Sequence, residues 1–355
     1  MIGYEYGNTR LRAMRTRLLG PTDLGAIIAS GSLDRMLAML ADTEYGADIE
    51  ASLVRAQGLR RLDDAVRSNL ARTLRQMASF YGDDEREKID LLLHRWDLRN
   101  LRALIRLPQA PLEPDDVSAL LVPAGRLGDT ELAELAAQPD IRSRIDLMVA
   151  WNIPSSETAI ALVRARTLFE LDGDTSSLES ALDNAFAAGM EEVLGDQRTG
   201  PASILRAETD SRNLDTALRL RAARVEREPG WSEHFGGYVP GGLVPIEVWE
   251  ETAETDQAEA IADLVTRRRL LPGWDAAIRE WVSHDNLITL ADKLQRATTS
   301  AAVARFVTGD VLGFDIPVAF TFAKEAEVRN LHLVGRGIVH GIAVAEIEAR
   351  LEVAA

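Results

Sequence analysis

A short phrase recurs three times along this chain at domain-sized intervals, and a looser copy stands near the N-terminus. An acidic residue, any residue and then Arg-Asn-Leu occupy Asp97–Leu101, Asp210–Leu214 and Glu327–Leu331, and Glu5–Asn8 keeps the acid three residues before the asparagine. The four asparagines are separated by 92, 113 and 117 residues. Self-similarity at this spacing predicts three related helical units and a closing helix.

A Gly-x-Leu turn follows each of the first three asparagines at a near-constant distance. The turns begin at Gly31, Gly125 and Gly241, which lie 23, 25 and 28 residues after the asparagine. Glycine tolerates the left-handed backbone that ends a helix, and the leucine can begin the next buried face. Because two signals recur together, we infer duplication and place the units at residues 1–108, 109–221 and 222–355, the last with the closing helix.

Helical periodicity dominates the chain. Apolar residues recur at three- and four-residue spacing, as in the stripe Leu92, Trp96 and Leu104. The best strand candidate, residues 318–322, is interpreted as the first turns of the last helix because Pro317 suits a helix N-terminus. Proline and glycine breaks leave only short connections, so we predict an all-α chain of packed helical hairpins.

The repeated phrase has a defined geometry on a helix. Its acid and asparagine are three residues apart and share one face. The arginine of each phrase recurs two turns later, which predicts a basic stripe roughly opposite the acid (Arg99 and Arg106, Arg212 and Arg219, Arg329 and Arg336). Acid and asparagine could tie neighbouring helices together while arginine faces solvent, or one of these faces could line a shared cavity for a partner. The second interpretation makes partner-interface candidates of Asn8, Arg12, Asn100, Asn213 and Asn330.

Composition and charge exclude several classes of protein. The 355 residues carry a formal net charge of -16, which opposes nucleic-acid binding and simple docking on anionic lipid. The absence of cysteine excludes disulfides and thiolate metal sites. No apolar run is long enough to span a membrane, and residues 1–6 lack a signal-peptide pattern. We therefore expect a cytoplasmic chain without a membrane span.

The motifs that would carry catalysis are absent from the sequence. There is no Gly-Lys-Ser/Thr triplet of a phosphate loop, and the glycines at 335–341 have the wrong spacing for a dinucleotide loop. We interpret those glycines as positions of close helix packing. Residues 236–242 could cradle a phosphate, but they lack a basic residue and fall where the repeat places a turn. We predict no catalytic residue, no cofactor and no metal, and an enzyme with an unrecognised helical site is the weakest hypothesis.

Several segments together resemble one protein family. Residues 4–14, followed by Leu18-Leu19, are similar to the opening of the C subunit of the rotary V/A-type ATPases, whose eukaryotic counterpart is the d subunit. Further similar segments follow in the family's order across essentially the whole chain, at residues 40–45, 96–102, 121–127, 239–243 and 323–331. The chain departs from the family pattern at Gly7 and in the glycine-rich stretch from Gly335 to Gly341.

The resemblance implies both a fold and a role. It implies three similar all-helical domains around a pseudo-threefold axis, forming a funnel. The chain would be a non-catalytic rotor component of a multisubunit complex, peripheral at the cytoplasmic face of the membrane. Its cup would receive the central shaft, built from the D and F subunits, and it would sit on the membrane ring of proteolipid subunits and transmit torque. A generic helical-repeat adaptor is the alternative.

Overall fold

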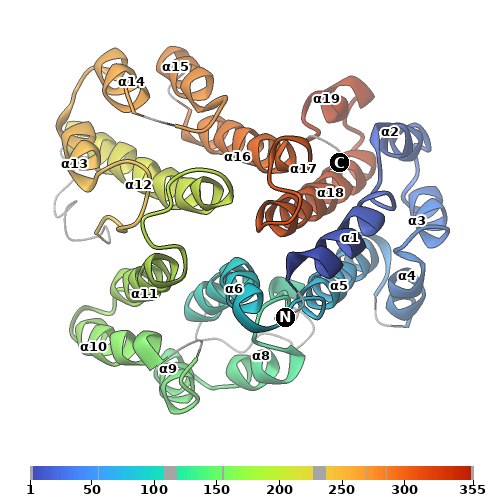
Figure 1. Ribbon diagram of the computed structural model, residues 1–355, viewed down its shortest axis with the longest axis horizontal. Helices are drawn as coiled ribbons and strands as arrows, with labels where there is room; N and C mark the ends of the chain where they lie inside the picture. The colour runs from blue at the N-terminus through green and yellow to red at the C-terminus, as the bar shows by residue number, and fades with distance from the viewer. Residues whose placement is uncertain are drawn as a thin grey trace. The chain divides into compact units, whose positions relative to one another are not determined.

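A computed structural model of the chain describes residues 3–54, 56–107, 117, 119–153, 156–226, 237–268, 270–284 and 286–352. Within these ranges the regular elements are helices and there is no strand, which confirms the predicted all-α class (Figure 1). None of the helices described is long and apolar enough to cross a membrane.

The helices group into two compact units, and neither unit is one continuous stretch of chain. Unit 1 comprises Met1–Leu93, Asp115–Gly128 and Ala302–Ala355, and unit 2 comprises His94–Pro114 and Asp129–Ala301. Unit 1 contains α1 (Tyr4–Arg15), α2 (Pro21–Ala29), α3 (Leu33–Ala41), α4 (Gly46–Ser52), α5 (Gly58–Ala78), α17 (Arg305–Thr308), α18 (Asp315–Val339) and α19 (Val344–Ala349). The division into three sequence repeats stays a prediction.

The remaining helices lie in unit 2, except for two whose residues are divided between the units. Those of unit 2 are α8 (Asp129–Ala136), α9 (Ile141–Ala150), α10 (Ser156–Asp172), α11 (Ser176–Leu194), α12 (Pro201–Glu226), α13 (Ile246–Glu254), α14 (Ala258–Thr266) and α15 (Trp274–His284). The two that cross the boundary are α6 (Asp83–Ile105) and α16 (Leu287–Val303).

The core of unit 1 forms around α18. Of the 25 residues of α18, 19 are buried, and the helix contacts α1, α2, α3, α5, α17 and α19. A helix that is buried on nearly all sides is a core helix rather than an amphipathic surface helix. Phe320 and Phe322 are fully buried within it, so the strand-like residues 318–322 are helical, as predicted. The helix begins at Asp315, two residues before Pro317.

Glycines allow the helices of unit 1 to pack closely. A Cβ atom on Gly335 would lie 2.2 Å from Leu62 Cδ2 of α5, and one on Gly337 would lie 2.5 Å from Ile347 Cδ1 of α19. Both distances are far below van der Waals contact, so a side chain at either position would displace its neighbour, and the close-packing interpretation is confirmed for Gly335 and Gly337. It is wrong for Gly341, which has φ +66° and no atom near its Cβ position. Gly7 is also a position of close packing, since a Cβ there would lie 2.3 Å from the ring of Tyr81.

Unit 2 consists of helix pairs in contact, joined by tight turns. Neighbours in sequence pack as α9 with α10, α10 with α11, α12 with α13 and α14 with α15. The turn between α10 and α11 contains Gly173 at φ +74°, where a side chain would be strained. Trp274 is buried and its indole Nε1 donates to Thr298 Oγ1 at 3.1 Å, which links α15 to α16. Trp96, which belongs to the apolar stripe identified in the sequence, and Trp281 are buried as well.

Candidate functional site

The structure separates the five predicted interface residues into two kinds. The four asparagine side chains are buried, with 1–2% of their surface exposed, on α1, α6, α12 and α18 (Asn8, Asn100, Asn213 and Asn330). Arg12 on α1 is exposed. The asparagines described below bind non-helical backbone of this same chain, whereas the first interpretation expected them to tie neighbouring helices together. That their helices line a cavity for a partner remains a prediction.

Two asparagines make the same contact in different units. Asn213 Nδ2 donates to the carbonyl of Val239 at 2.8 Å, and its Oδ1 accepts from the N–H of Val239 at 2.8 Å. Asn330 binds Glu352 in the same way, at 3.3 Å and 2.8 Å. We call this pattern an asparagine clamp. It satisfies both backbone groups of a non-helical residue that would otherwise lack partners.

Asn8 serves a similar purpose with different partners. Its Nδ2 donates to the carbonyl oxygens of Val311 at 2.8 Å and Gly313 at 3.0 Å. Its Oδ1 accepts from the hydroxyl of Tyr81 at 2.8 Å. The amide of Asn8 therefore fixes the turn between α17 and α18 against α1.

The acid of the repeated phrase binds backbone too. Asp210 accepts from the N–H groups of Leu243 at 2.7 Å and Val244 at 3.2 Å. A Cβ atom on Gly242 would lie 2.1 Å from Asp210 Oδ1, so only glycine fits there. Gly241 adopts φ +87°, the left-handed backbone predicted for this turn. For the copy of the phrase at Asp210–Leu214, the Gly-x-Leu turn is thus the binding partner of the acid.

A buried arginine, Arg206, also binds this turn. Together, Asp210, Asn213 and Arg206 hold residues 239–244 against α12, and we call these three residues the clasp. The guanidinium of Arg206 donates to Glu191 Oε1 at 2.5 Å and to the carbonyl of Gly241 at 2.6 Å. Because of this charged hydrogen bond, the pKa of Glu191 is lowered. Sequence reasoning missed Arg206, since nothing in its local pattern separates it from the many surface arginines.

The carboxyl of Asp210 has an unusual pKa. Burial raises this pKa to about 7, although the two N–H donors and the nearby Arg198 and Arg206 act in the opposite direction. An ordinary aspartate titrates at 3.8, so between these values the folded chain holds a proton that the unfolded chain has lost. The contribution of Asp210 to stability is therefore full below about pH 4 and is lost as the pH rises to about 7.

This shift predicts a pH-dependent difference between the wild type and the variant Asp210→Asn. The free energy of unfolding of the wild type minus that of Asp210→Asn should fall as the pH rises from about 4 to about 7, and should be constant above that. Urea unfolding of both proteins across this range measures the difference. A carboxyl carbon NMR titration of Asp210 with a midpoint near the ordinary value would contradict the assignment.

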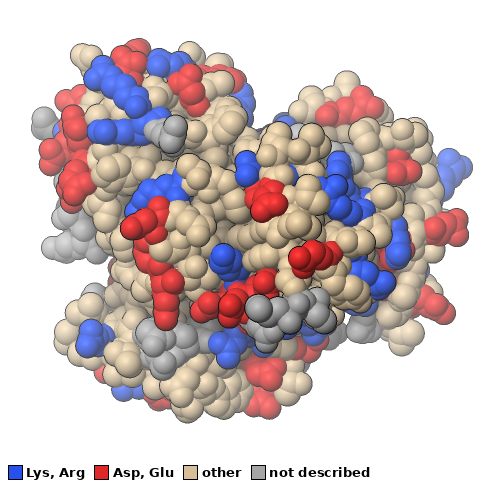
Figure 2. Space-filling model, in the orientation of Figure 1, with Lys and Arg blue, Asp and Glu red and all other residues tan. Residues whose placement is uncertain are grey.

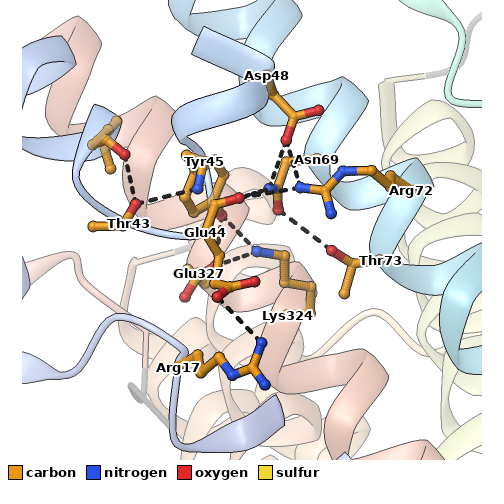
Figure 3. A network of polar contacts seen from close by, with 11 residues as sticks. Arg17, Thr43, Glu44, Tyr45, Asp48, Asn69, Arg72, Thr73, Lys324 and Glu327 are labelled. Carbon is orange, nitrogen blue, oxygen red and sulfur yellow. Dashed lines mark hydrogen bonds and ion pairs between the residues drawn. The ribbon is translucent and has the colours of Figure 1, made fainter. Parts of the chain in front are cut away.

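Unit 1 contains a second buried polar network, centred on Glu327 (Figure 3). Glu327 Oε1 accepts from Lys324 Nζ at 2.5 Å and from the hydroxyl of Tyr45 at 2.5 Å, and its Oε2 accepts from the N–H of Leu19 at 2.5 Å. Lys324 is 2% exposed and also donates to the oxygen of Tyr45 at 2.8 Å. Burial lowers the pKa of Lys324 and raises that of Tyr45. We call Lys324, Glu327 and Tyr45 the ionic core.

The network continues from the ionic core into α4 and α5. Asn69 Nδ2 donates to Asp48 Oδ2 at 2.9 Å and to the carbonyl of Glu44 at 2.8 Å, and Arg72 donates to the same Asp48 oxygen at 2.7 Å (Figure 3). Sequence reasoning missed these residues. One signal was present, since Lys324 is one of only three lysines and stands three residues before Glu327, on the same face of the helix.

Several arginines of the predicted basic stripes form ion pairs with carboxylates of the same chain. Arg106 pairs with Glu179, and Arg212 and Arg102 both pair with Asp183 one turn further along α11. Arg329 pairs with Glu352 at 2.5 Å, beside the Asn330 clamp. The interpretation that these arginines face solvent is wrong for Arg212 and Arg329, because each is partly buried against a carboxylate.

Comparison with known proteins gives a consistent result. The family described as "ATP synthase (C/AC39) subunit" matches residues 7–350. The C subunit of the V-type ATP synthase from Deinococcus radiodurans is 28% identical over 98% of this chain and 91% of its own length. The C subunits of the A-type ATP synthases from Haloferax volcanii and Methanosarcina acetivorans are 24% and 25% identical over 98% and 94% of this chain, and over 97% and 88% of their own lengths.

Proposed function

Because this chain belongs to the family of ATP synthase C/AC39 subunits, we propose that it is a non-catalytic rotor component of a V/A-type rotary ATPase or ATP synthase. The observation that carries the proposal is similarity over nearly the full length to proteins named as the C subunits of V-type and A-type ATP synthases. The similarity extends over almost the whole length of this chain and of these relatives, so it is not limited to one shared segment.

The polar chemistry of the described residues supports a mechanical role. The buried carboxylates Asp210 and Glu327 bind backbone N–H groups, and Lys324 binds Glu327 and Tyr45. These groups bind partners within the chain and hold helices and loops in place. A part that transmits torque needs rigid internal contacts more than it needs reactive groups.

The proposed partners are the central shaft, built from the D and F subunits, and the membrane ring of proteolipid subunits. The chain would link the two as a socket at the cytoplasmic face, peripheral to the membrane, and couple ATP synthesis or hydrolysis to ion transport. We retain the three-domain funnel as part of this proposal. The shaft would bind the helices of Asn8, Asn100, Asn213 and Asn330. Arg12 would contact the shaft directly, and the asparagines would hold their helices in place.

A deletion experiment tests the coupling role. Membranes from a strain of the natural host that lacks this chain should still hydrolyse ATP, because the catalytic subunits of the complex remain. ATP-driven uptake of ions into membrane vesicles should be lost. Expression of the wild-type chain in the deletion strain should restore uptake. Ion uptake at the wild-type rate per ATP hydrolysed in the deletion strain would contradict the proposal and favour a helical-repeat adaptor with another partner.

A further inference from the structure

The segments that form unit 1 are far apart in the sequence. Its core helix α18 contacts α1, α2, α3 and α5, which all precede unit 2 along the chain. The N–H of Leu19 and the hydroxyl of Tyr45 donate to the Glu327 carboxylate across 308 and 282 residues. Asn8 Nδ2 donates to the carbonyl of Val311 across 303 residues. Unit 1 therefore joins two parts of the chain that are separated by unit 2.

The segments of unit 2 are much closer together in the sequence. Most of its helix pairs are neighbours along the chain, such as α10 with α11 and α12 with α13. Arg95 Nε of α6 donates to Glu208 Oε2 of α12 at 2.6 Å, and Arg106 Nε donates to Glu179 Oε1 of α11 at 2.7 Å. These contacts span 113 and 73 residues. Contacts between nearby segments cost less chain entropy and form faster, so unit 2 can assemble before α18 is in place.

The closure of unit 1 depends on the state of unit 2 for two physical reasons. While unit 2 is unfolded, α5 and α18 are connected by a long flexible loop, and bringing its ends together costs entropy that grows with loop length. Folding of unit 2 removes most of this freedom before unit 1 closes. In addition, the residues of α6 and α16 are divided between the units, and a helix that loses half of its residues is only marginally stable in water.

Until α18 is in place, the earlier helices of unit 1 expose apolar surface. Leu62 and Met77 of α5 are fully buried against α18, where Leu62 lies beside Gly335 and the Met77 sulfur accepts from the hydroxyl of Thr321 at 3.5 Å. In the folded chain, by contrast, charged side chains of both signs are spread over the face shown in Figure 2. The α4–α5 pair can form early because its helices contact each other, but its apolar face stays open and prone to aggregation.

We propose that the fold contains a folding checkpoint, in which unit 2 folds first and α18 closes unit 1 only on a chain whose unit 2 is folded. The inference rests on the order of the segments and on their contacts, and it does not depend on the proposed function. A chain with a defective unit 2 keeps the apolar faces of α1, α2, α3 and α5 open. Any partner that binds the closed form of unit 1 therefore selects chains in which both units are folded.

Matched proline substitutions in the full-length chain test this order. Leu182 on α11 and Leu331 on α18 are 1% and 0% exposed, and proline at either interior position breaks its helix and leaves a core site partly empty. Hydrogen exchange with mass spectrometry measures the protection of each helix. In Leu182→Pro, which acts on unit 2, the protection factors of α18 should fall below about 10. In Leu331→Pro, which acts on unit 1, α18 should lose protection while α10 and α11 keep protection factors above about 100.

Two results would overturn the inference in these variants. One is protection of α18 in a chain whose α11 has lost its own, and the other is loss of α11 protection in Leu331→Pro, since the units would then fold as one. If α11 stays protected in Leu182→Pro, urea is added until that protection is lost, and α18 must have lost its protection by the same concentration. The wild type must obey the same rule in urea.

Refolding of the wild type gives an independent measure of the order. Pulsed hydrogen exchange after dilution from urea should show α11 becoming protected at least about threefold faster than α18, because the contacts of α18 span far more of the chain. Protection of α18 at the same rate as α11, or before it, would overturn the inference.

Discussion

Replacement of Lys324 by methionine should lower the free energy of unfolding by about 3–5 kcal/mol, the range typical of a buried ion pair that loses one partner. Lys324 and Glu327 are almost fully buried on one face of α18, 2.5 Å apart. Methionine fills a similar volume but leaves the Glu327 carboxylate without its cation. Urea unfolding measures the loss, and hydrogen exchange should show it as faster exchange in α18 and α4.

The companion variant is the double substitution Lys324→Met with Glu327→Gln. The glutamine oxygen can still accept from the N–H of Leu19, its NH2 group can donate to the hydroxyl oxygen of Tyr45, and the side chain carries no charge that needs compensation. The double variant should therefore be more stable than Lys324→Met alone. Two results would contradict this account of the ionic core. One is that Lys324→Met unfolds at the same urea concentration as the wild type. The other is that the double variant is no more stable than Lys324→Met alone.

Replacement of Asn213 by leucine should cost about 2–4 kcal/mol of unfolding free energy, because it leaves two buried backbone groups unpaired. The side chain now binds both the N–H and the C=O of Val239, and both residues are almost fully buried, so water cannot easily replace the lost contacts. Urea unfolding gives the total loss. The amide of Val239 should lose its protection against hydrogen exchange.

An exposed asparagine in the same unit provides the control. Asn184 on α11 is exposed, so Asn184→Leu makes the same chemical change at the surface and should alter stability by less than about 0.5 kcal/mol. Equal stabilities of the Asn213→Leu and Asn184→Leu variants would show that the asparagine clamp contributes nothing to holding the turn before α13.

The sequence predicted the class of fold and the helices of the repeated phrase, because helical periodicity and helix breaks are local signals. It also predicted the glycine packing positions of α18. It could not predict what the asparagines bind. An asparagine clamp holds backbone, and the clamped residue can be of any type, as Val239 and Glu352 show. The Gly-x-Leu turn at Gly241 indicates the region that Asn213 binds, but no residue type identifies Val239 or Glu352 as the clamped residue 26 or 22 residues away.

The compact units were equally hidden in the sequence. Unit 1 joins the first residues of the chain to Ala302–Ala355, and the Glu327 contacts with Leu19 and Tyr45 show how. Pairing between segments about 300 residues apart depends on tertiary packing, which periodicity within a short window does not contain. The same reason explains why Arg206 and Lys324 could not be recognised as buried residues from their neighbours alone.

Cross-linking of the intact complex from the natural host tests the central claim most directly. A tag on this chain, gentle solubilisation and mass spectrometry identify both what is purified with it and which of its residues contact each partner. The account predicts recovery of the whole ATP synthase, with cross-links from this chain to the D and F subunits of the shaft and to the proteolipid ring. A complete, active complex that lacks this chain, or a chain recovered alone, would contradict the claim that it joins the shaft to the ring.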